Sequence, residues 1–203
     1  MKWTLALIAI NTIIFVFEIL FTNFFFNYLA FIPKYALYMP WMFITSIFLH
    51  GDFFHLFFNM LALFFFGSYF ENLYGSKRFL TLYFLAGILG NLAYFLYDPN
   101  STIPGVGASG AIYGVMGALA ILRPFTIVYV NLLPVPLIAA AVFWLIINLV
   151  GIIYPVGNIG YHAHLAGLLV GFYYGYRLKK EGVVYYEYSY QDYFWNVDLR
   201  RRL

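Results

Sequence analysis

Charged residues are sparse along this chain and divide it into long apolar segments. No Asp, Glu, Lys or Arg occurs in residues 53–70, 79–97, 99–122 or 124–176. An apolar segment of about 20 residues is long enough to cross a lipid bilayer as a helix. The pattern therefore predicts six transmembrane helices, with approximate limits at residues 3–22, 55–70, 79–97, 109–122, 127–153 and 161–178. The connection between the first two, residues 23–54, is long and aromatic, and we expect it to be an interfacial loop.

The composition excludes a soluble protein. Of the 203 residues, 64% are hydrophobic, 24% aromatic and only 9% charged, and the mean hydropathy is +0.83. Soluble domains carry about 25% charged residues, which they need for a surface that faces water. We therefore expect an all-α polytopic membrane protein, a six-helix bundle surrounded by membrane lipids and without a large water-exposed domain.

Net charge and cysteine content exclude further classes of function. The net charge is only +3, and the basic residues lie between apolar segments instead of along one stripe, which argues against a nucleic-acid partner. Because the chain has no cysteine, it forms no disulfide and performs no thiol chemistry. No pattern in the sequence points to a particular oligomeric state.

The distribution of Lys and Arg predicts the orientation in the membrane. Six helices place both termini on one side, and all eleven basic residues except Lys34 fall on that side. Because basic residues are enriched in cytoplasmic loops, we expect a multi-pass protein of the cell membrane with both termini in the cytoplasm. Residues 1–180 would form the six-helix core, and residues 181–203, rich in Tyr and closing with three arginines, a cytoplasmic tail.

Polar side chains gather at the start of three predicted helices. In this orientation the second, fourth and sixth helices begin near the outer face. The polar residues in or next to their first turns are His50, His55, Asn59, Ser109, His162 and His164. Polar groups are costly inside a membrane and therefore indicate function. We expect them to form one cluster that opens toward the outer face.

Small residues predict that the fourth and sixth helices pack closely. They recur every four positions in both: Gly110, Gly114 and Ala118 in one helix, and Ala163, Gly167, Gly171 and Gly175 in the other. This spacing lets two membrane helices approach backbone to backbone. Such an approach would bring Ser109 within reach of His164.

Ser109 and His164 are the residue types of nucleophilic catalysis. A serine hydroxyl becomes nucleophilic when a neighbouring base accepts its proton, and His162 is the second candidate for that base. Ser109 also begins a helix, where backbone N–H groups stabilise an oxyanion, and His55 and Asn59 add side-chain donors. Since no carboxylate belongs to the cluster, a Ser-His dyad fits better than a triad.

The depth of Ser109 also bears on its function. The 15 residues from Ser109 to Arg123 span about 22 Å as a helix, less than the roughly 30 Å of hydrocarbon. If Arg123 lies at the cytoplasmic surface, Ser109 is submerged and has to line a water-filled cavity.

Taken singly, each polar residue of the predicted cluster has a simpler interpretation. A serine before a helix commonly caps that helix, and a His or Asn in a membrane helix commonly hydrogen-bonds to a neighbouring helix.

At three places the chain resembles the rhomboid intramembrane serine proteases. Residues 107–110, Gly-Ala-Ser-Gly, resemble the family's G-x-S-G nucleophile motif, with Tyr113 one turn below. Residues 163–167, Ala-His-Leu-Ala-Gly, followed by Gly171, resemble A-H-x-x-G-x-x-x-G. The third motif, H-x-x-x-x-H-x-x-x-N, is matched by His50, His55 and Asn59. Order, spacing and layout agree over residues 3–180.

The resemblance implies an enzyme that hydrolyses peptide bonds in or beside the transmembrane segments of other membrane proteins. Ser109 would be the nucleophile and His164 the general base, with Tyr113 packed against the histidine ring. The resemblance further implies an oxyanion hole of His55, Asn59 and the Ser109 N–H, supported by Gly107, Gly110, Gly167, Gly171 and His50. No metal or organic cofactor is implied.

One departure from the family is visible, and two other functions stay open. Many members carry a Trp-Arg pair in the first loop, where this chain has Trp41 and Met42, so we expect the anchoring of that loop or its interaction with the membrane to differ. A catalytically inactive relative would bind membrane proteins without cleaving them, although such relatives usually lack the serine or the histidine. A histidine-based metal transporter is disfavoured because His162 and His164 point about 200° apart on a helix.

Overall fold

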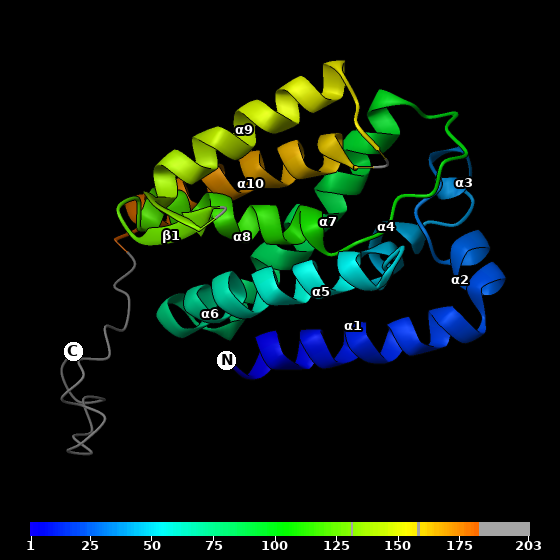
Figure 1. The fold of residues 1–203 in the computed structure, drawn as a ribbon, viewed down its shortest axis with the longest axis horizontal. Helices are drawn as coiled ribbons and strands as arrows, with labels where there is room; N and C mark the ends of the chain where they lie inside the picture. The colour runs from blue at the N-terminus through cyan, green and yellow to red at the C-terminus, as the bar shows by residue number, and fades with distance from the viewer. Residues whose placement is uncertain (131, 158, 183–203) are drawn as a thin grey trace.

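The computed structural model describes residues 1–130, 132–157 and 159–182, and these residues are mainly helical (Figure 1). Its longer helices are α1 (Lys2–Leu20), α5 (Phe53–Ala62), α6 (Ser68–Tyr74), α7 (Ser76–Tyr97), α8 (Ser109–Leu122), α9 (Leu137–Ile153) and α10 (Tyr161–Lys180). A π-helical turn, Leu63–Gly67, joins α5 to α6 without a break. All of the predicted tail after Gly182 lies outside the described residues.

Three helical segments are long and apolar enough to cross a membrane. They are Lys2–Leu20, Phe53–Tyr74, which combines α5 and α6, and Ser76–Tyr97. Helices α8 and α9 are apolar but shorter. The limits of α8 are those that the sequence predicts, and the second span is longer at both ends than the predicted 55–70. The prediction of a mainly helical chain with segments long and apolar enough to cross a membrane is therefore confirmed.

The prediction of one helix over residues 127–153 is wrong for its first part. That part forms an antiparallel hairpin of β1 (Ile127–Val130) and β2 (Leu133–Pro136). Pro134 and Pro136 have no N–H to donate in a helix interior, whereas proline is tolerated in an edge strand. Helix α9 therefore begins only at Leu137, and the hairpin is a departure from an all-α fold.

The connection expected to be an interfacial loop, residues 23–54, is partly helical. It contains most of α2 (Thr22–Tyr28) and all of α3 (Pro33–Ala36) and α4 (Met42–Thr45), followed by a 3-10 turn, Ser46–Phe48. Phe31 and Met42 are fully buried in a small apolar cluster that also packs on α7. Phe31 also exchanges two backbone hydrogen bonds with Gly105, at 2.8 and 2.9 Å. This connection therefore supports the segment that leads into α8.

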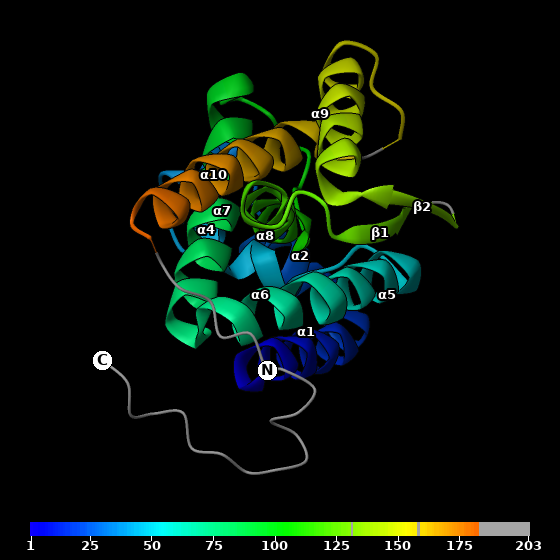
Figure 2. The ribbon, with the colours of Figure 1, turned by 90° about the vertical axis from the view of Figure 1, so that its left-hand side faces the viewer.

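Helix α8 lies at the centre of the molecule. Figure 2 views it nearly end-on, surrounded by α7, α10, α9 and the continuous helical segment Phe53–Tyr74, which we call the α5–α6 rod. Most of its side chains are buried, and many are Gly or Ala. Because such a thin helix lets its neighbours approach closely, side chains from several helices can meet at its first residue, Ser109.

Candidate active site

Ser109 and His164 meet at the starts of two adjacent helices. Ser109 is the first residue of α8, and His164 lies in the first turn of α10. The distance from His164 Nε2 to Ser109 Oγ is 2.7 Å, which is that of a hydrogen bond. The fold thus joins a hydroxyl and an imidazole, two groups between which a proton can move directly.

Close packing of α8 on α10 holds these two residues together. A Cβ atom added at Gly167 would collide with the carbonyl oxygen of Gly110, and one at Gly171 with that of Gly114. On the other helix, a Cβ at Gly110 would lie 3.4 Å from the Ala163 carbonyl oxygen. The two rows of small residues therefore face each other with their backbones in contact.

An aromatic ring fixes the orientation of the His164 ring. The rings of Tyr113 and His164 are stacked, with centroids 4.5 Å apart and planes 13° apart. Tyr113 in turn contacts Trp144 of α9 edge to face, with centroids at 6.3 Å. The imidazole is therefore held between α8 and α10 in the orientation that directs Nε2 at the serine.

His55 approaches the pair from α5. The N–H of Gly51 donates to His55 Nδ1 at 3.3 Å, and the Asp52 carboxylate accepts the His55 N–H at 2.9 Å and caps α5. Because Nδ1 is an acceptor, the neutral ring carries its proton on Nε2. A Cβ placed at Gly107 would lie 2.8 Å from that Nε2 and 3.6 Å from Ser109 Oγ. His55 thus presents an N–H group beside the serine hydroxyl.

Gly107 makes this approach possible. Its φ of +126° lies in a region that other residues rarely adopt, and any side chain would strike the His55 ring. The Gly107 N–H donates to the Ser46 carbonyl at 3.0 Å, and this bond holds the irregular segment before α8 in place. Both the backbone and the available space therefore require glycine here.

Asn59 lies one turn after His55 on the same helix. Its side chain is mostly buried, and Nδ2 donates to the His55 carbonyl at 2.8 Å. Among the described residues, no hydrogen bond joins Asn59 to Ser109 or His164. Since an amide nitrogen has two hydrogens, one donor is left for another group. His55 is the side-chain donor that lies against Gly107 beside Ser109.

His50 packs against the His55 ring, and Glu18 binds the backbone of His50. His50 is 1% exposed, its ring centroid is 5.1 Å from that of His55, and its N–H donates to both Glu18 carboxylate oxygens at 3.1 and 3.2 Å. Burial, with a smaller contribution from His55, lowers the pKa of His50 to about 3, so its ring is neutral. The contact with Glu18 was not predicted, although a lone carboxylate near the end of an apolar helix could have indicated it.

His162 points away from the serine. Its ring stacks on Tyr97 of α7 at a centroid distance of 3.7 Å and lies 6.4 Å from Tyr94. The structure thus distributes the four histidines among different roles: His164 and His55 lie beside Ser109, whereas His50 lies behind them and His162 packs on α7.

No carboxylate among the described residues hydrogen-bonds to His164. Asp52 caps α5, and Glu18 binds the backbone of His50. The local arrangement is therefore a serine–histidine pair without a third acidic member. Such a pair, beside a helix N-terminus and a histidine N–H, can carry out acyl transfer to and from the serine.

Comparison with known proteins gives a consistent result over most of the chain. The model of the Rhomboid domain matches residues 38–181, which include all the cluster residues except Glu18. Rhomboid protease GluP of Bacillus subtilis (strain 168) is 39% identical over 137 residues, 66% of this chain and 25% of the relative. Rhomboid protein 1, mitochondrial, of Saccharomyces cerevisiae is 35% identical over 146 residues, 68% of this chain and 41% of the relative.

Another relative is described as inactive. Inactive RHOMBOID-like protein 8 of Arabidopsis thaliana is 40% identical over 79 residues, 39% of this chain and 22% of the relative. The matches thus cover less than half of the length of each of these three relatives. Proteins described as proteases and as inactive therefore both resemble this chain.

Proposed function

This chain belongs to the rhomboid family of membrane proteins, and we propose that it is a serine endopeptidase of the membrane interior. Its substrates would be other membrane proteins, cleaved in or next to their transmembrane segments. The observation that carries this proposal is the 2.7 Å contact between Ser109 Oγ and His164 Nε2. That retained pair favours the active relatives over the inactive one as the guide to function.

Ser109 is the proposed nucleophile and His164 the general base. As Oγ attacks the scissile carbonyl carbon, His164 Nε2 accepts the hydroxyl proton and then gives it to the leaving amine, which leaves an acyl-serine ester. A water molecule then attacks the ester carbonyl while His164 takes its proton. The proton returns to Ser109 Oγ as the new carboxyl end departs, so the enzyme is regenerated without a metal or organic cofactor.

The negative charge that develops on the carbonyl oxygen needs hydrogen-bond donors. The backbone N–H of Ser109 and the Nε2–H of His55 are the proposed donors, with the second hydrogen of the Asn59 amide as a third. The N-terminal end of α8 adds the positive end of a helix dipole. Tyr113 keeps the His164 ring in position by stacking on it.

The proposed architecture has six membrane spans in residues 1–180. These are α1, the α5–α6 rod, α7, α8, α9 and α10, with both termini in the cytoplasm of a cell and the site opening toward the outer face of the cell membrane. The 14 residues of α8 cover about 21 Å, less than the roughly 30 Å hydrocarbon layer, which supports a submerged Ser109. Water would reach it through a cavity.

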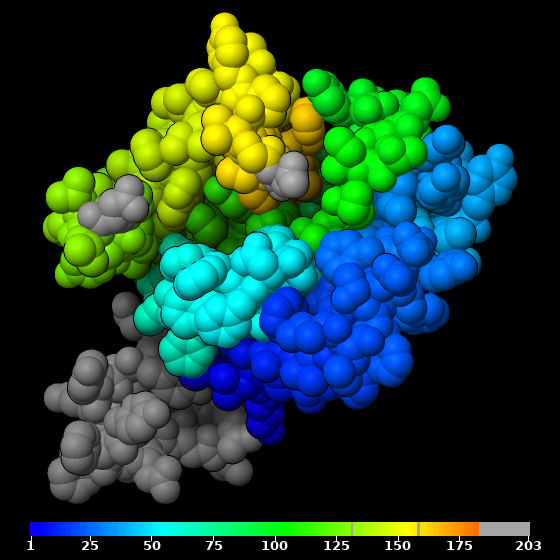
Figure 3. All heavy atoms as spheres, turned by 45° about the vertical axis from the view of Figure 1, so that its right-hand side comes forward, coloured from blue at the N-terminus to red at the C-terminus, as the bar shows by residue number. Residues whose placement is uncertain are grey.

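Substrate would approach the serine from the lipid side. Figure 3 shows the surface hollowed between α5 and α9, above the region of α8. Phe66 of the π-helical turn after α5 and Trp144 of α9 are in edge-to-face contact, with ring centroids 6.2 Å apart. A transmembrane segment that enters here would reach Ser109 without passing through the aqueous phase.

Cleavage in a reconstituted membrane tests this function. The protein and its Ser109→Ala variant are incorporated into vesicles with single-span test proteins, with and without a chelator, and the products are separated on a gel. Chelator-resistant cleavage by the unaltered protein alone is expected. If several test spans stay intact and Ser109 does not react with a fluorophosphonate, a non-catalytic rhomboid-like binder of membrane proteins is the better account. Cleavage that a chelator abolishes would favour a metal-based function.

A further inference from the structure

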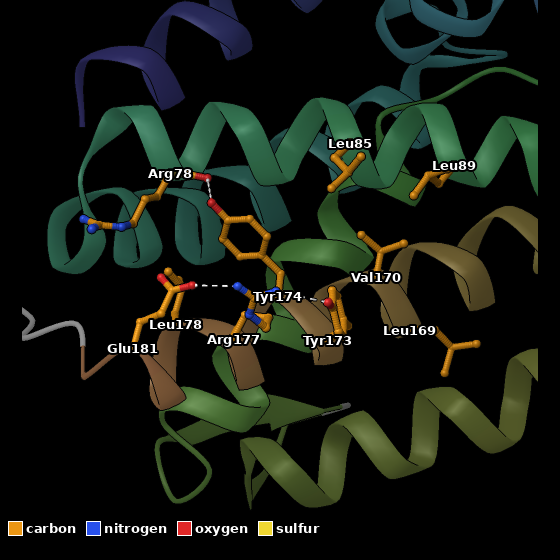
Figure 4. Close-up of a pocket in the computed structure, with 10 residues that line it drawn as sticks. All are labelled: Arg78, Leu85, Leu89, Leu169, Val170, Tyr173, Tyr174, Arg177, Leu178 and Glu181. Atoms are coloured by element: carbon orange, nitrogen blue, oxygen red, sulfur yellow. Dashed lines mark hydrogen bonds and ion pairs between the residues drawn. The ribbon is translucent and has the colours of Figure 1, made fainter.

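A groove separates α7 from α10 at the end of the molecule opposite to Ser109. Its volume is about 660 Å³, within the range of ligand-binding sites. Figure 4 shows its side chains divided in two groups along its length. Charged residues lie toward the first turn of α7 and the last turn of α10, where Leu178 also lies, and the other aliphatic residues lie toward the middle of both helices.

The groove opens because α7 and α10 diverge toward this end. Near the outer end the two backbones touch, and a Cβ at Gly90 would lie 3.0 Å from the Ala163 carbonyl oxygen. At the other end the full length of a tyrosine side chain bridges them, with Tyr174 Oη donating to the Arg78 carbonyl at 3.4 Å. The groove is therefore a wedge that narrows toward the outer end, where α7 and α10 touch, and widens toward the end that carries Arg78.

The inner part of the wedge is apolar and exposed. Its walls are Leu85 and Leu89 on α7 and Leu169 and Val170 on α10. Leu85 is 41% and Leu169 50% exposed, so the protein does not cover them. The 12 residues from Arg78 to Leu89 rise about 17 Å, which is close to half of the roughly 30 Å hydrocarbon layer. The wedge thus has the length of one acyl chain in one leaflet.

The wide end of the wedge carries two guanidinium groups. Arg177 donates to Tyr173 Oη at 3.3 Å and pairs with Glu181 at 3.2 Å, and Arg78 donates to the Tyr74 carbonyl at 3.3 Å. Both partners of the Arg177–Glu181 pair are more than half exposed, so the pair contributes little stability and a stronger anion can displace the carboxylate. Guanidinium groups match the geometry of phosphate oxygens.

We propose that this wedge binds one anionic phospholipid. The headgroup phosphate would displace Glu181 from Arg177 and bind between Arg177 and Arg78, with the Tyr173 hydroxyl as a further donor. One acyl chain would lie along the leucine walls. The described charged residues that line the wedge, Arg78, Arg177 and Glu181, carry a net charge of +1, which complements an anionic headgroup. A transmembrane helix would fill the apolar part but would leave both guanidinium groups without a phosphate.

Quenching of a single fluorophore locates the lipid directly. Because the chain has no cysteine, Leu169→Cys carries one bimane group in the wedge, and Ile13→Cys carries one on the lipid-facing side of α1. Leu169 is 11 residues from Lys180 and Ile13 is 11 residues from Lys2, so the two probes report on similar depths. Each labelled protein is placed in vesicles that contain brominated phosphatidylglycerol or brominated phosphatidylcholine, and thermal unfolding confirms that each variant is folded.

The expected result is selective quenching in the wedge. One basic residue near the membrane surface contributes about 1 kcal/mol to the free energy of binding anionic lipid. The probe at Leu169 should therefore show about a fivefold preference for the anionic lipid in its quenching, and the probe at Ile13 should show no such preference. Arg78→Gln with Arg177→Gln should abolish the preference. The matched control, Lys77→Gln with Lys179→Gln, removes the same charge from exposed positions outside the wedge and should keep it. Glu181→Gln should increase it.

Several results would overturn the proposal. Equal loss in the arginine and lysine double variants would mean that diffuse surface charge, not a site, attracts the lipid. No quenching by either lipid would mean that protein covers the wedge, and loss of the preference in the presence of soluble glycerol 3-phosphate would mean that the arginines bind free phosphate esters. Since the readout needs no cleavage, its failure is distinct from failure of the proposed protease function.

Discussion

At the scale of single residues, the proposed chemistry depends on which imidazole faces the serine. His162 and His164 are two positions apart and begin the same helix, so spacing along the chain makes both candidates. The structure separates them, because His164 lies 2.7 Å from Ser109 Oγ whereas His162 stacks on Tyr97. A base has to be within hydrogen-bond reach of the proton it accepts. The geometry therefore favours His164.

Substitution of each histidine separates their roles. We expect His164→Ala to abolish cleavage of a reconstituted single-span substrate, because no other described group lies in hydrogen-bond distance of Ser109 Oγ. His162→Ala should retain cleavage, since its ring contacts α7 and not the serine. Initial rates of product formation in vesicles measure both. A silent His164→Ala together with an inactive His162→Ala would reverse the assignment.

The two side-chain donors of the oxyanion hole should contribute unequally. His55 Nε2 faces Gly107 next to Ser109, whereas the Asn59 amide already donates to the His55 carbonyl. Loss of one donor typically lowers kcat by about 10²–10³-fold, and we expect His55→Ala to show that effect and Asn59→Ala a smaller one. Single-turnover kinetics in lipid, with unfolding temperatures as a control for folding, measure the difference. A larger effect of Asn59→Ala would contradict the order.

At the scale of helices and strands, hydropathy predicts where most helices lie but not where an apolar segment is interrupted. The limits of α8 follow from the sequence because Ser109 and Arg123 bracket an unbroken apolar segment. Hydropathy does not predict the hairpin before α9, because residues 127–136 are as apolar as a span and only Pro134 and Pro136 indicate that a helix cannot form there. Likewise, the short helices in residues 23–54 are held by burial of Phe31 and Met42, which no local period reveals.

For the candidate active site too, the positions of residues along the chain predict which side chains lie near one another but not the hydrogen bonds that orient them. The sequence places Ser109, His55 and His164 in one layer because each begins or nearly begins a helix at the same end. The bonds that orient them come from turns: Gly51 fixes the tautomer of His55, and Glu18 holds the backbone of His50. Turn geometry depends on contacts between distant segments, so a single sequence does not specify it.

The contact between α8 and α10 can be tested with one added methyl group. In Gly167→Ala the new Cβ would collide with the Gly110 carbonyl oxygen, so the two helices would have to separate. A displacement of about 1 Å can cost about 10²-fold in rate, and we expect at least that loss together with a lower unfolding temperature. Gly160→Ala is the control, because its Cβ would meet its nearest neighbour at 3.9 Å. Equal effects of the two substitutions would refute a specific role of the Gly167 contact.

At the scale of the whole molecule, the two ends of the bundle differ in chemistry. One end carries Ser109, His55 and His164. The other carries the N-terminus, whose amine pairs with Glu71 at 3.4 Å, and the basic residues of α7 and α10. The Glu71 carboxylate also accepts hydrogen bonds from the Thr4 backbone and from Ser76, which ties α1 to the junction of α6 and α7. Because basic residues favour the cytoplasmic side, the serine should open toward the opposite face.

Single cysteines test this orientation in whole cells. Asn100→Cys lies in the exposed connection between α7 and α8, and Lys180→Cys lies at the end of α10. We expect a membrane-impermeant maleimide to label Asn100→Cys in intact cells and Lys180→Cys only after the cells are permeabilised. The opposite labelling would place the termini outside and invert the proposed topology.

Covalent labelling of Ser109 is the most direct measurement of the central claim, that Ser109 is a nucleophile activated by His164. The full chain in lipid vesicles is treated with a fluorophosphonate, and the modified residue is identified by peptide mass spectrometry. The account predicts modification of Ser109 in the unaltered protein and in His162→Ala, and a loss of modification in His164→Ala. Equal modification of Ser109 with and without His164, or its absence from the unaltered protein under conditions where a control serine protease reacts, would contradict it.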